Sequence, residues 1–284
     1  REVAFALGLN LSVARSGSVF NDILSPWVAR EHGVAATLWF GAALCLVSFL
    51  CNVVLRMPRL YWLLTVLCVI LYCGILPFNN IASAFFVETT FSGLPQAEAQ
   101  QRAGYAMSLL FMVSALGTPA FGGLVDLVGY RTHFLLLSST LLAGTYACIS
   151  VLRPEVATCA LGCVYTIFAG ALWPSFALTV PQKQLGTAYG VAVALQNSGL
   201  AVVPILVGHL QATAGKGHFH SVMMLFFAMG LAGTAVAWEL HNSNKARRGV
   251  LDLPSAEAEA AFAAGEAAPL KGKGIMKAAG AGPN

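Results

Sequence analysis

The sequence predicts an all-α membrane protein on three observations. Of the 284 residues, 57% are hydrophobic and 10% are charged, whereas a soluble domain carries about 25% charged residues. The mean hydropathy is +0.73. Apolar runs repeatedly approach the ~20 residues that a helix needs to cross a ~30 Å hydrocarbon core. Because these runs are too long and too continuously apolar for barrel strands, we expect helices to span the bilayer.

The apolar runs predict eight spanning helices, which differ in the polarity of their centres. The second, fifth and eighth runs have almost no polar residue there. The first, third, sixth and seventh carry polar side chains, which is typical of helices that line a cavity. The predicted helices cover residues 3–28, 34–55, 60–86, 104–125, 133–152, 156–180, 186–210 and 219–239.

The first predicted helix has an arginine at its centre. Arg15 lies about a dozen residues, or ~18 Å, from either end, beyond the reach of a snorkelling side chain. Burial there costs at least ~2.5–3.5 kcal/mol, so Arg15 must face protein or a water-filled cavity. Ser12, Ser18 and Asp22 share its helix face. One interpretation is an anion site, because a guanidinium grips a carboxylate with two hydrogen bonds. The alternative is a structural ion pair with Asp22, about 10 Å away along the axis, or with an acid on another helix.

Three later helices place polar residues close to a proline, which is the arrangement expected of a mid-membrane binding site. Each of these side chains is equally explained by hydrogen bonding between helices. The candidate substrate contacts are Asn80, Tyr165, Trp173, Gln196 and Asn197, near Pro77, Pro174 and Pro204.

The distribution of Lys and Arg predicts the orientation. With eight spans, both termini and three loops share one side, which we expect to be cytosolic. That side carries Arg1, Arg56, Arg59, Arg131, Lys183, Lys245, Arg247, Arg248 and three lysines farther out, whereas the opposite side carries Arg30, Arg102, Arg153 and Lys216. The net charge of +4 reflects this bias, and we expect no nucleic-acid partner.

All seven cysteines lie within predicted helices, which indicates neither a disulfide framework nor a zinc site. We expect no metal and no cofactor. The chain begins at Arg1 without a signal peptide, so we expect a fragment. Residues 254–284 are rich in Ala and Gly without an amphipathic pattern, which predicts a disordered cytosolic tail with at most a turn or two of helix.

The loop after the fourth predicted helix reads GGLVDLVGYR, from Gly122 to Arg131. It resembles the G-x-L-x-D-x-x-G-[RK]-[RK] signature of the major facilitator superfamily, with Tyr130 in place of one basic residue. We expect Gly122 to let two helices approach, Asp126 to face a positively charged neighbour, and Gly129 to turn a short loop.

A second resemblance covers nearly all of residues 5–240. The stretches LNLSVARSGSVFN (9–21), ILPFNNIASAFFVETTF (75–91) and ALWPSFALTVPQKQLGTAYGVAVALQNSGLAVV (171–203) closely resemble the lysosomal dipeptide transporters of this superfamily. The resemblance implies a twelve-helix bundle of which about eight helices are present, the fifth to the twelfth. It implies the last two helices of the N-terminal half in residues 1–56, the C-terminal half in residues 57–240 and a cytosolic tail in residues 241–284.

The resemblance also implies a function. It implies a facilitator in the lysosomal membrane that alternates a central site between lumen and cytosol and exports dipeptides, with Arg15 as the partner of the dipeptide carboxylate. The helix expected to hold the amino group is missing, so we expect the fragment alone not to transport. The one N-x-[ST] sequon, Asn10-Leu11-Ser12, lies within a span, and the family implies a glycosylated accessory membrane protein that would protect such a chain.

Energy coupling and the substrate leave alternatives. Asp22 is a candidate proton site, and His209, His218 and His220 cluster near the lumenal side, but uniport is the preferred prediction. A related carrier of another small organic anion would suit Arg15 equally. An intramembrane enzyme needs a buried catalytic pair, and Asp22 is the one mid-span acid. A seven- or eight-helix receptor would not explain the loop motif.

Overall fold

The structure is a computed structural model that describes residues 57–214, 219–246 and 249–263, together with residues 27, 30, 31, 33 and 39–43. Six long helices in these ranges correspond to the last six predicted runs. The first two predicted spans lie almost entirely outside the described residues. The long helices are α2 (Arg59–Thr89), α3 (Gln96–Val128), α4 (Arg131–Cys148), α5 (Pro154–Ala177), α6 (Leu185–Ala214) and α7 (His220–Lys245). The short ones are η1 (Gln182–Gln184), η2 (Val250–Asp252) and α8 (Ser255–Ala263).

Five of the described helices, namely α2, α3, α5, α6 with η1, and α7, are long and apolar enough to cross a membrane. The exception, α4, has 18 residues and begins with a charged side chain, Arg131. Its hydroxyl groups do not give it a polar face, because Ser139, Thr140 and Thr145 each donate a hydrogen bond to a carbonyl one turn earlier in the same helix. These three hydroxyl groups are therefore satisfied within the helix.

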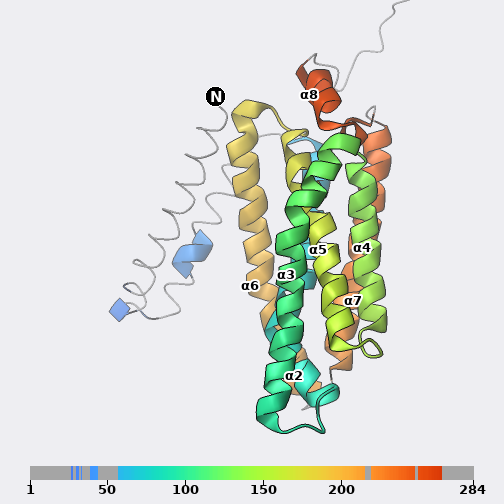
Figure 1. The fold of residues 1–284 in the computed structure, drawn as a ribbon. Helices are drawn as coiled ribbons and strands as arrows, with labels where there is room; N and C mark the ends of the chain where they lie inside the picture. Colours follow the sequence, from blue (N-terminus) through green and yellow to red (C-terminus); the bar gives the residue numbers. More distant parts are fainter. Residues whose placement is uncertain are drawn as a thin grey trace, which may run out of the picture.

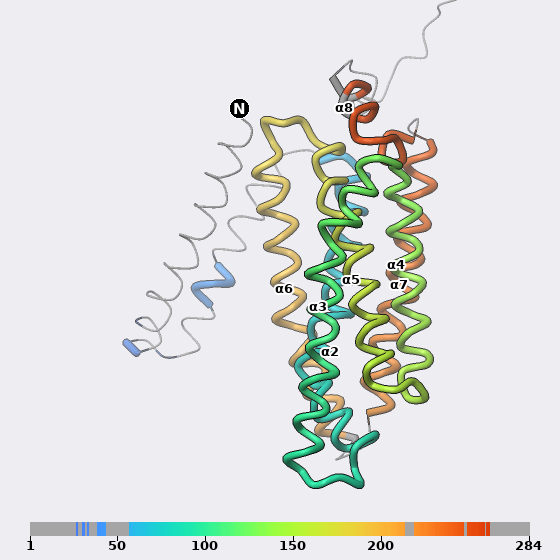
Figure 2. Tube along the Cα trace, in the orientation of Figure 1, coloured from blue at the N-terminus to red at the C-terminus, as the bar shows by residue number. Residues whose placement is uncertain are grey.

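The six long helices form one bundle around α2 (Figures 1 and 2). α2 packs against α6 and α7 and also contacts α3 and α5, while α3 packs on α5, and α4 on α7 and α5. The loop between α3 and α4 lies at the same end of the bundle as α8 (Figure 1), and we call this the motif end. Four basic residues lie at this motif end, where helices begin or end, namely Arg59, Arg131, Lys183 and Lys245. The structure thus groups these positive charges as the sequence predicts.

Glycines set the closest approach between α3 and α5. A Cβ on Gly162 would lie 2.8 Å from the Leu110 carbonyl oxygen and 2.9 Å from Val113 Cβ. Among the described residues a Cβ on Gly122 would meet nothing within 4 Å, so the lack of a side chain at Gly122 is not what lets α3 and α5 approach. The Gly122 backbone is instead approached from the other side by Gly170, whose Cβ would lie 3.4 Å from Gly122 N.

Prolines are distributed unevenly over the bundle. Each of α2, α3, α5 and α6 has one proline beyond its first turn, namely Pro77, Pro119, Pro174 and Pro204 respectively. α5 also begins at a proline, Pro154. No proline lies inside the described α4 or α7. The helices therefore fall into two pairs with one proline beyond the first turn of each helix, α2 with α6 and α3 with α5, and a third pair, α4 with α7, without any.

The segment after residue 240 differs from the predicted disordered tail. α7 continues to Lys245, and η2 and α8 follow after Gly249. Leu251 and Ala258 are fully buried, and the segment is hydrogen bonded to the motif end of α4. These tertiary contacts order a stretch that has no amphipathic pattern of its own. Residues 264–284 lie outside the described residues.

Candidate functional site

The loop between α3 and α4 consists of two residues in the left-handed conformation. α3 ends at Val128, Gly129 has φ +72° and Tyr130 has φ +53°, and α4 begins at Arg131. This confirms the predicted turn at Gly129, since glycine adopts a positive φ without steric cost. The structure adds a second reason for glycine, because a Cβ there would lie 2.5 Å from the Leu253 carbonyl carbon.

Arg131 is buried at the motif end, with a side chain 1% exposed. Its Nη1 donates to the carbonyl oxygens of Leu253 (2.8 Å) and Leu251 (3.4 Å). Its Nη2 lies 3.5 Å from Asp126 Oδ1 and donates to Ser255 Oγ, which in turn donates to Asp126 Oδ1 at 2.7 Å. Asp126 thus faces a positively charged neighbour as predicted, and the serine bridges the pair.

Residues 249–255, which we call the C-terminal clasp, also hold the beginning of α4. The Asp252 carboxylate accepts hydrogen bonds from Thr132 N (2.9 Å), Thr132 Oγ1 (2.7 Å) and Asn244 Nδ2 (2.9 Å). Tyr130 N donates to the Asp252 carbonyl oxygen at 3.1 Å. A carboxylate at the first turn of a helix is favourable because it accepts unpaired N–H groups at the positive end of the helix dipole. The clasp therefore joins the motif loop, α4 and α7.

Aromatic side chains from α2 and α5 meet inside the bundle. Trp173 Nε1 donates to Tyr72 OH at 2.9 Å, and the ring of Tyr72 also meets Tyr165 edge-on, with centroids 5.7 Å apart. Tyr165 and Trp173 are both partly buried. Two predicted substrate contacts thus come together around Tyr72, a residue that the sequence analysis missed.

A tyrosine of α6 extends this cluster. Tyr189 OH donates to the Trp173 carbonyl oxygen at 2.9 Å, and their rings are 5.9 Å apart. The sequence analysis also missed Tyr189. A signal was available for both missed residues, because a tyrosine inside an apolar span needs a partner for its hydroxyl.

The predicted residues of α6 and the end of α2 differ in environment. Gln196 is buried at 9% exposure and its Oε1 lies 3.8 Å from Cys68 Sγ, one helical turn before Tyr72. Asn80 and Asn197 are exposed, so they lie on the surface of the described bundle. Arg15 and Asp22 lie outside the described residues.

The described part of this site consists of uncharged groups. Tyr72, Tyr165, Trp173, Tyr189 and Gln196 offer hydroxyl, indole and amide groups beside aromatic faces. Such a surface orients a small polar or cationic molecule by hydrogen bonds and ring contacts. Any charge that binds a carboxylate must come from a residue outside this group, which is the role predicted for Arg15.

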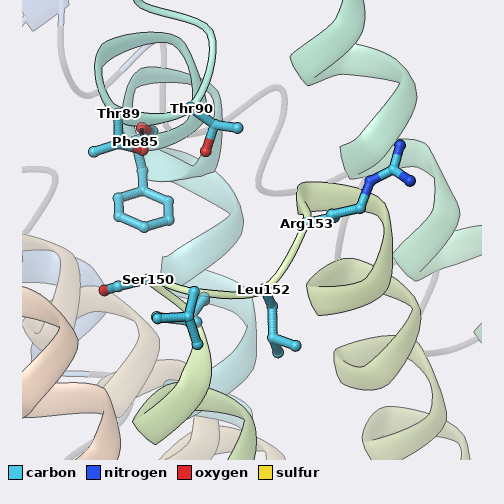
Figure 3. Close-up of a pocket in the computed structure, with 8 residues that line it drawn as sticks. Phe85, Thr89, Thr90, Ser150, Leu152 and Arg153 are labelled. Atoms are coloured by element: carbon cyan, nitrogen blue, oxygen red, sulfur yellow. Dashed lines mark hydrogen bonds between the residues drawn. The ribbon is translucent and has the colours of Figure 1, made fainter.

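A cavity of about 360 Å³ lies at the end of the bundle opposite the motif end. It is formed where the end of α2 faces the loop between α4 and α5 (Figure 3). Phe85, Thr89 and Thr90 line one side, and Ser150 and Leu152 the other, while the Arg153 side chain points away from Phe85 (Figure 3). None of the predicted substrate contacts lines this cavity.

Comparison with known proteins gives a consistent result. Residues 70–277 match the Major Facilitator Superfamily. The chain is 30% identical to the lysosomal dipeptide transporter MFSD1 of Gallus gallus over 87% of this chain and 66% of that protein. Identity to the MFSD1 of Homo sapiens is 28%, over 91% of this chain and 62% of the relative. Identity to the MFSD1 of Danio rerio is 32%, over 76% of this chain and 54% of the relative. The chain thus spans less than two thirds of the length of these relatives.

Proposed function

The chain belongs to the major facilitator superfamily, and we propose that it is the larger part of a facilitator that exports dipeptides from the lysosome to the cytosol by alternating access. The observation that carries the proposal is the cluster of Tyr72, Tyr165, Trp173 and Tyr189, which joins α2, α5 and α6 inside the bundle. Relatives that share 28–32% identity are lysosomal dipeptide transporters, which supports the substrate class and the location. A transporter, rather than an enzyme, fits a site built of uncharged hydrogen-bonding groups.

We further propose a division of labour within the site. Arg15 binds the dipeptide carboxylate, because a guanidinium offers two parallel donors and keeps its charge in a low-dielectric cavity. Tyr165, Trp173 and Gln196 contact the peptide backbone and side chains from the C-terminal half. Asn80 and Asn197 are exposed on the described bundle, where a second half of the cavity would cover them.

The motif loop supports alternating access at the cytosolic end. Arg131 and Asp126 are joined by Ser255, and the Asp126 side chain remains 55% exposed. The exposed Asp126 carboxylate can contact a neighbouring part of the transporter in one state of the transport cycle and lose that contact in the other. A contact of this kind distinguishes the two states.

Dipeptide uptake into proteoliposomes by the chain with the expected upstream helices restored tests the proposal. We expect Arg15→Ala to lower uptake by about 10- to 100-fold, the value of a lost charge-assisted hydrogen bond pair, and Arg15→Lys to restore little of it. Arg153→Ala is the matched control, because its side chain is 84% exposed and points away from Phe85 in Figure 3. Uptake that is unchanged in both Arg15 variants of a folded protein would instead assign Arg15 to a structural ion pair.

Energy coupling is proposed to be uniport. Asp22 is the candidate proton site of the alternative, in which transport is proton-coupled and the cargo is another small organic anion. His209 and His220 are exposed, which is the environment of solvated side chains. A dipeptide uptake rate that is unchanged by an imposed pH gradient supports uniport, whereas an uptake rate that follows the gradient supports coupling.

A glycosylated accessory membrane protein is the proposed lumenal partner, and lipid surrounds the bundle. The sequon at Asn10 lies within a predicted span, so protection against lysosomal proteases would have to come from a companion. Affinity purification of the full chain from lysosomal membranes tests this proposal, and recovery without any glycoprotein would contradict it.

A further inference from the structure

Three side chains with metal-binding chemistry meet at the motif end, outside the substrate site. His133 lies in the first turn of α4, His241 near the end of α7, and Asp252 in η2 of the C-terminal clasp. One ligand atom from each lies within 4.8 Å of the others. We propose that these residues form a binding site for a divalent transition metal of the zinc class, which fastens the clasp to α4 and α7.

The distances suit a metal site that closes by small side-chain movements. His133 Nδ1 is 3.6 Å from Asp252 Oδ1, and His241 Nδ1 is 3.9 Å from Asp252 Oδ2. Ligand atoms around a tetrahedral zinc ion are roughly 3.4 Å apart, since each bond is about 2.0–2.2 Å long. Each histidine therefore needs to approach the carboxylate by only a few tenths of an ångström.

The carboxylate is already oriented by its own hydrogen bonds. Thr132 donates from its backbone N and its hydroxyl, and Asn244 donates from its side-chain amide. Partners of this kind fix the direction of a ligand and raise metal affinity. The Thr132 hydroxyl also lies 2.8 Å from His241 Nδ1, so a metal at that nitrogen displaces this contact while the hydroxyl keeps its bond to Asp252.

The two imidazole rings lie close together. Their centroids are 4.5 Å apart at an interplanar angle of 72°. Neutral imidazole is the ligand form. Two imidazoles and one carboxylate select zinc, copper or nickel over magnesium or calcium, which prefer oxygen ligands.

The site is accessible and its ligands come from three separate elements. The His133 side chain is 50% exposed, whereas those of His241 and Asp252 are 7% and 16% exposed. A metal can therefore enter from the solvent side of His133, and water can complete its coordination. Once bound, the metal joins α4, α7 and the clasp through bonds stronger than the hydrogen bonds that join them otherwise.

Thermal unfolding of the purified full chain in detergent, after treatment with a chelator, tests the proposal. We expect Zn²⁺ at about 100 times its Kd to raise the unfolding midpoint by roughly 5 °C, and Mg²⁺ to leave it unchanged. His133→Ala should abolish the rise without unfolding the protein, because the ring is half-exposed. His209→Ala, which removes an exposed histidine of α6, should retain it.

Visible absorption of bound Co²⁺ gives a second readout with the same variants. We expect ligand-field bands in the wild type and in His209→Ala that are absent in His133→Ala. The absence of a Zn²⁺-dependent rise in the wild type, or an equal rise in His133→Ala, would overturn the proposal. Neither readout uses transport, so the result stands apart from the test of dipeptide export.

Discussion

The contact between α3 and α5 allows a prediction in which two glycines of the same helix pair behave in opposite ways. At Gly162 an added Cβ would lie 2.8 Å from Leu110 O and 2.9 Å from Val113 Cβ, whereas non-bonded carbon atoms prefer about 3.5–4.0 Å. The helices must separate by about 0.5–1 Å to accept Gly162→Ala. Overpacking of this kind costs about 1–3 kcal/mol of unfolding free energy.

At Gly122 the same substitution meets no obstacle, because a Cβ there has nothing within 4 Å. Alanine is favoured over glycine in a helix by about 0.8–1.0 kcal/mol. Gly122→Ala should therefore be neutral or stabilising. The same preference for alanine applies at Gly162, so the two variants should differ by the overpacking cost alone, about 1–3 kcal/mol of unfolding free energy. For a chain of this size that corresponds to unfolding midpoints roughly 2–10 °C apart.

Thermal unfolding of both variants of the full chain in one detergent measures this difference. Gly162→Ala should melt below the wild type and Gly122→Ala at or above it. The expectation from sequence, that Gly122 lets two helices approach, instead predicts that Gly122→Ala melts below the wild type. A Gly162→Ala protein that melts as high as Gly122→Ala would refute the packing described for α3 and α5.

Three further predictions follow from the motif end and the aromatic cluster. Gly129→Ala should lower the free energy of unfolding by about 2–4 kcal/mol, because alanine is strained at a positive φ and its Cβ would collide with the clasp backbone. Limited proteolysis should then cut the clasp faster than in the wild type. Tyr72→Phe should cost about 1–3 kcal/mol of unfolding free energy, since it leaves the partly buried Trp173 Nε1 without its acceptor. A lowered unfolding midpoint together with a raised KM for dipeptide is the expected outcome. Glu239→Gln, which breaks the 2.8 Å pair with Arg59, should change the midpoint by less than the equivalent of about 1 kcal/mol, because both side chains are largely exposed.

The helices of the bundle could be predicted from the sequence because hydrophobic length specifies a membrane span almost by itself. The runs at 60–86, 104–125 and 156–180 fall within or close to α2, α3 and α5. The ends were less accurate, and α3 begins eight residues earlier than its run, at Gln96, since the helix continues beyond the apolar stretch. Hydropathy does not report where hydrogen bonding ends.

The candidate site could be predicted only in part. Tyr165 and Trp173 were found because they precede a proline in their helix. Tyr72, which precedes Pro77, was missed because its role depends on which helix face meets α5. The ordering of the clasp could not be predicted either. Its stability comes from hydrogen bonds of Arg131 and Asp252 with residues more than 100 positions away in the chain, and no local pattern encodes such contacts.

The uneven distribution of prolines gives the bundle an uneven bending stiffness. A proline removes one hydrogen bond from the helix and crowds the turn before it, so that turn bends most easily. In α2 and α6, which pack together, Pro77 and Pro204 lie in the half of the helix away from the motif end, whereas Pro119 and Pro174 of α3 and α5 lie in the half near it. α2 and α6 therefore bend most easily in the half away from the motif end, and α3 and α5 in the half near it. α4 and α7, with no proline inside either helix, bend least, so the other two pairs can bend relative to them.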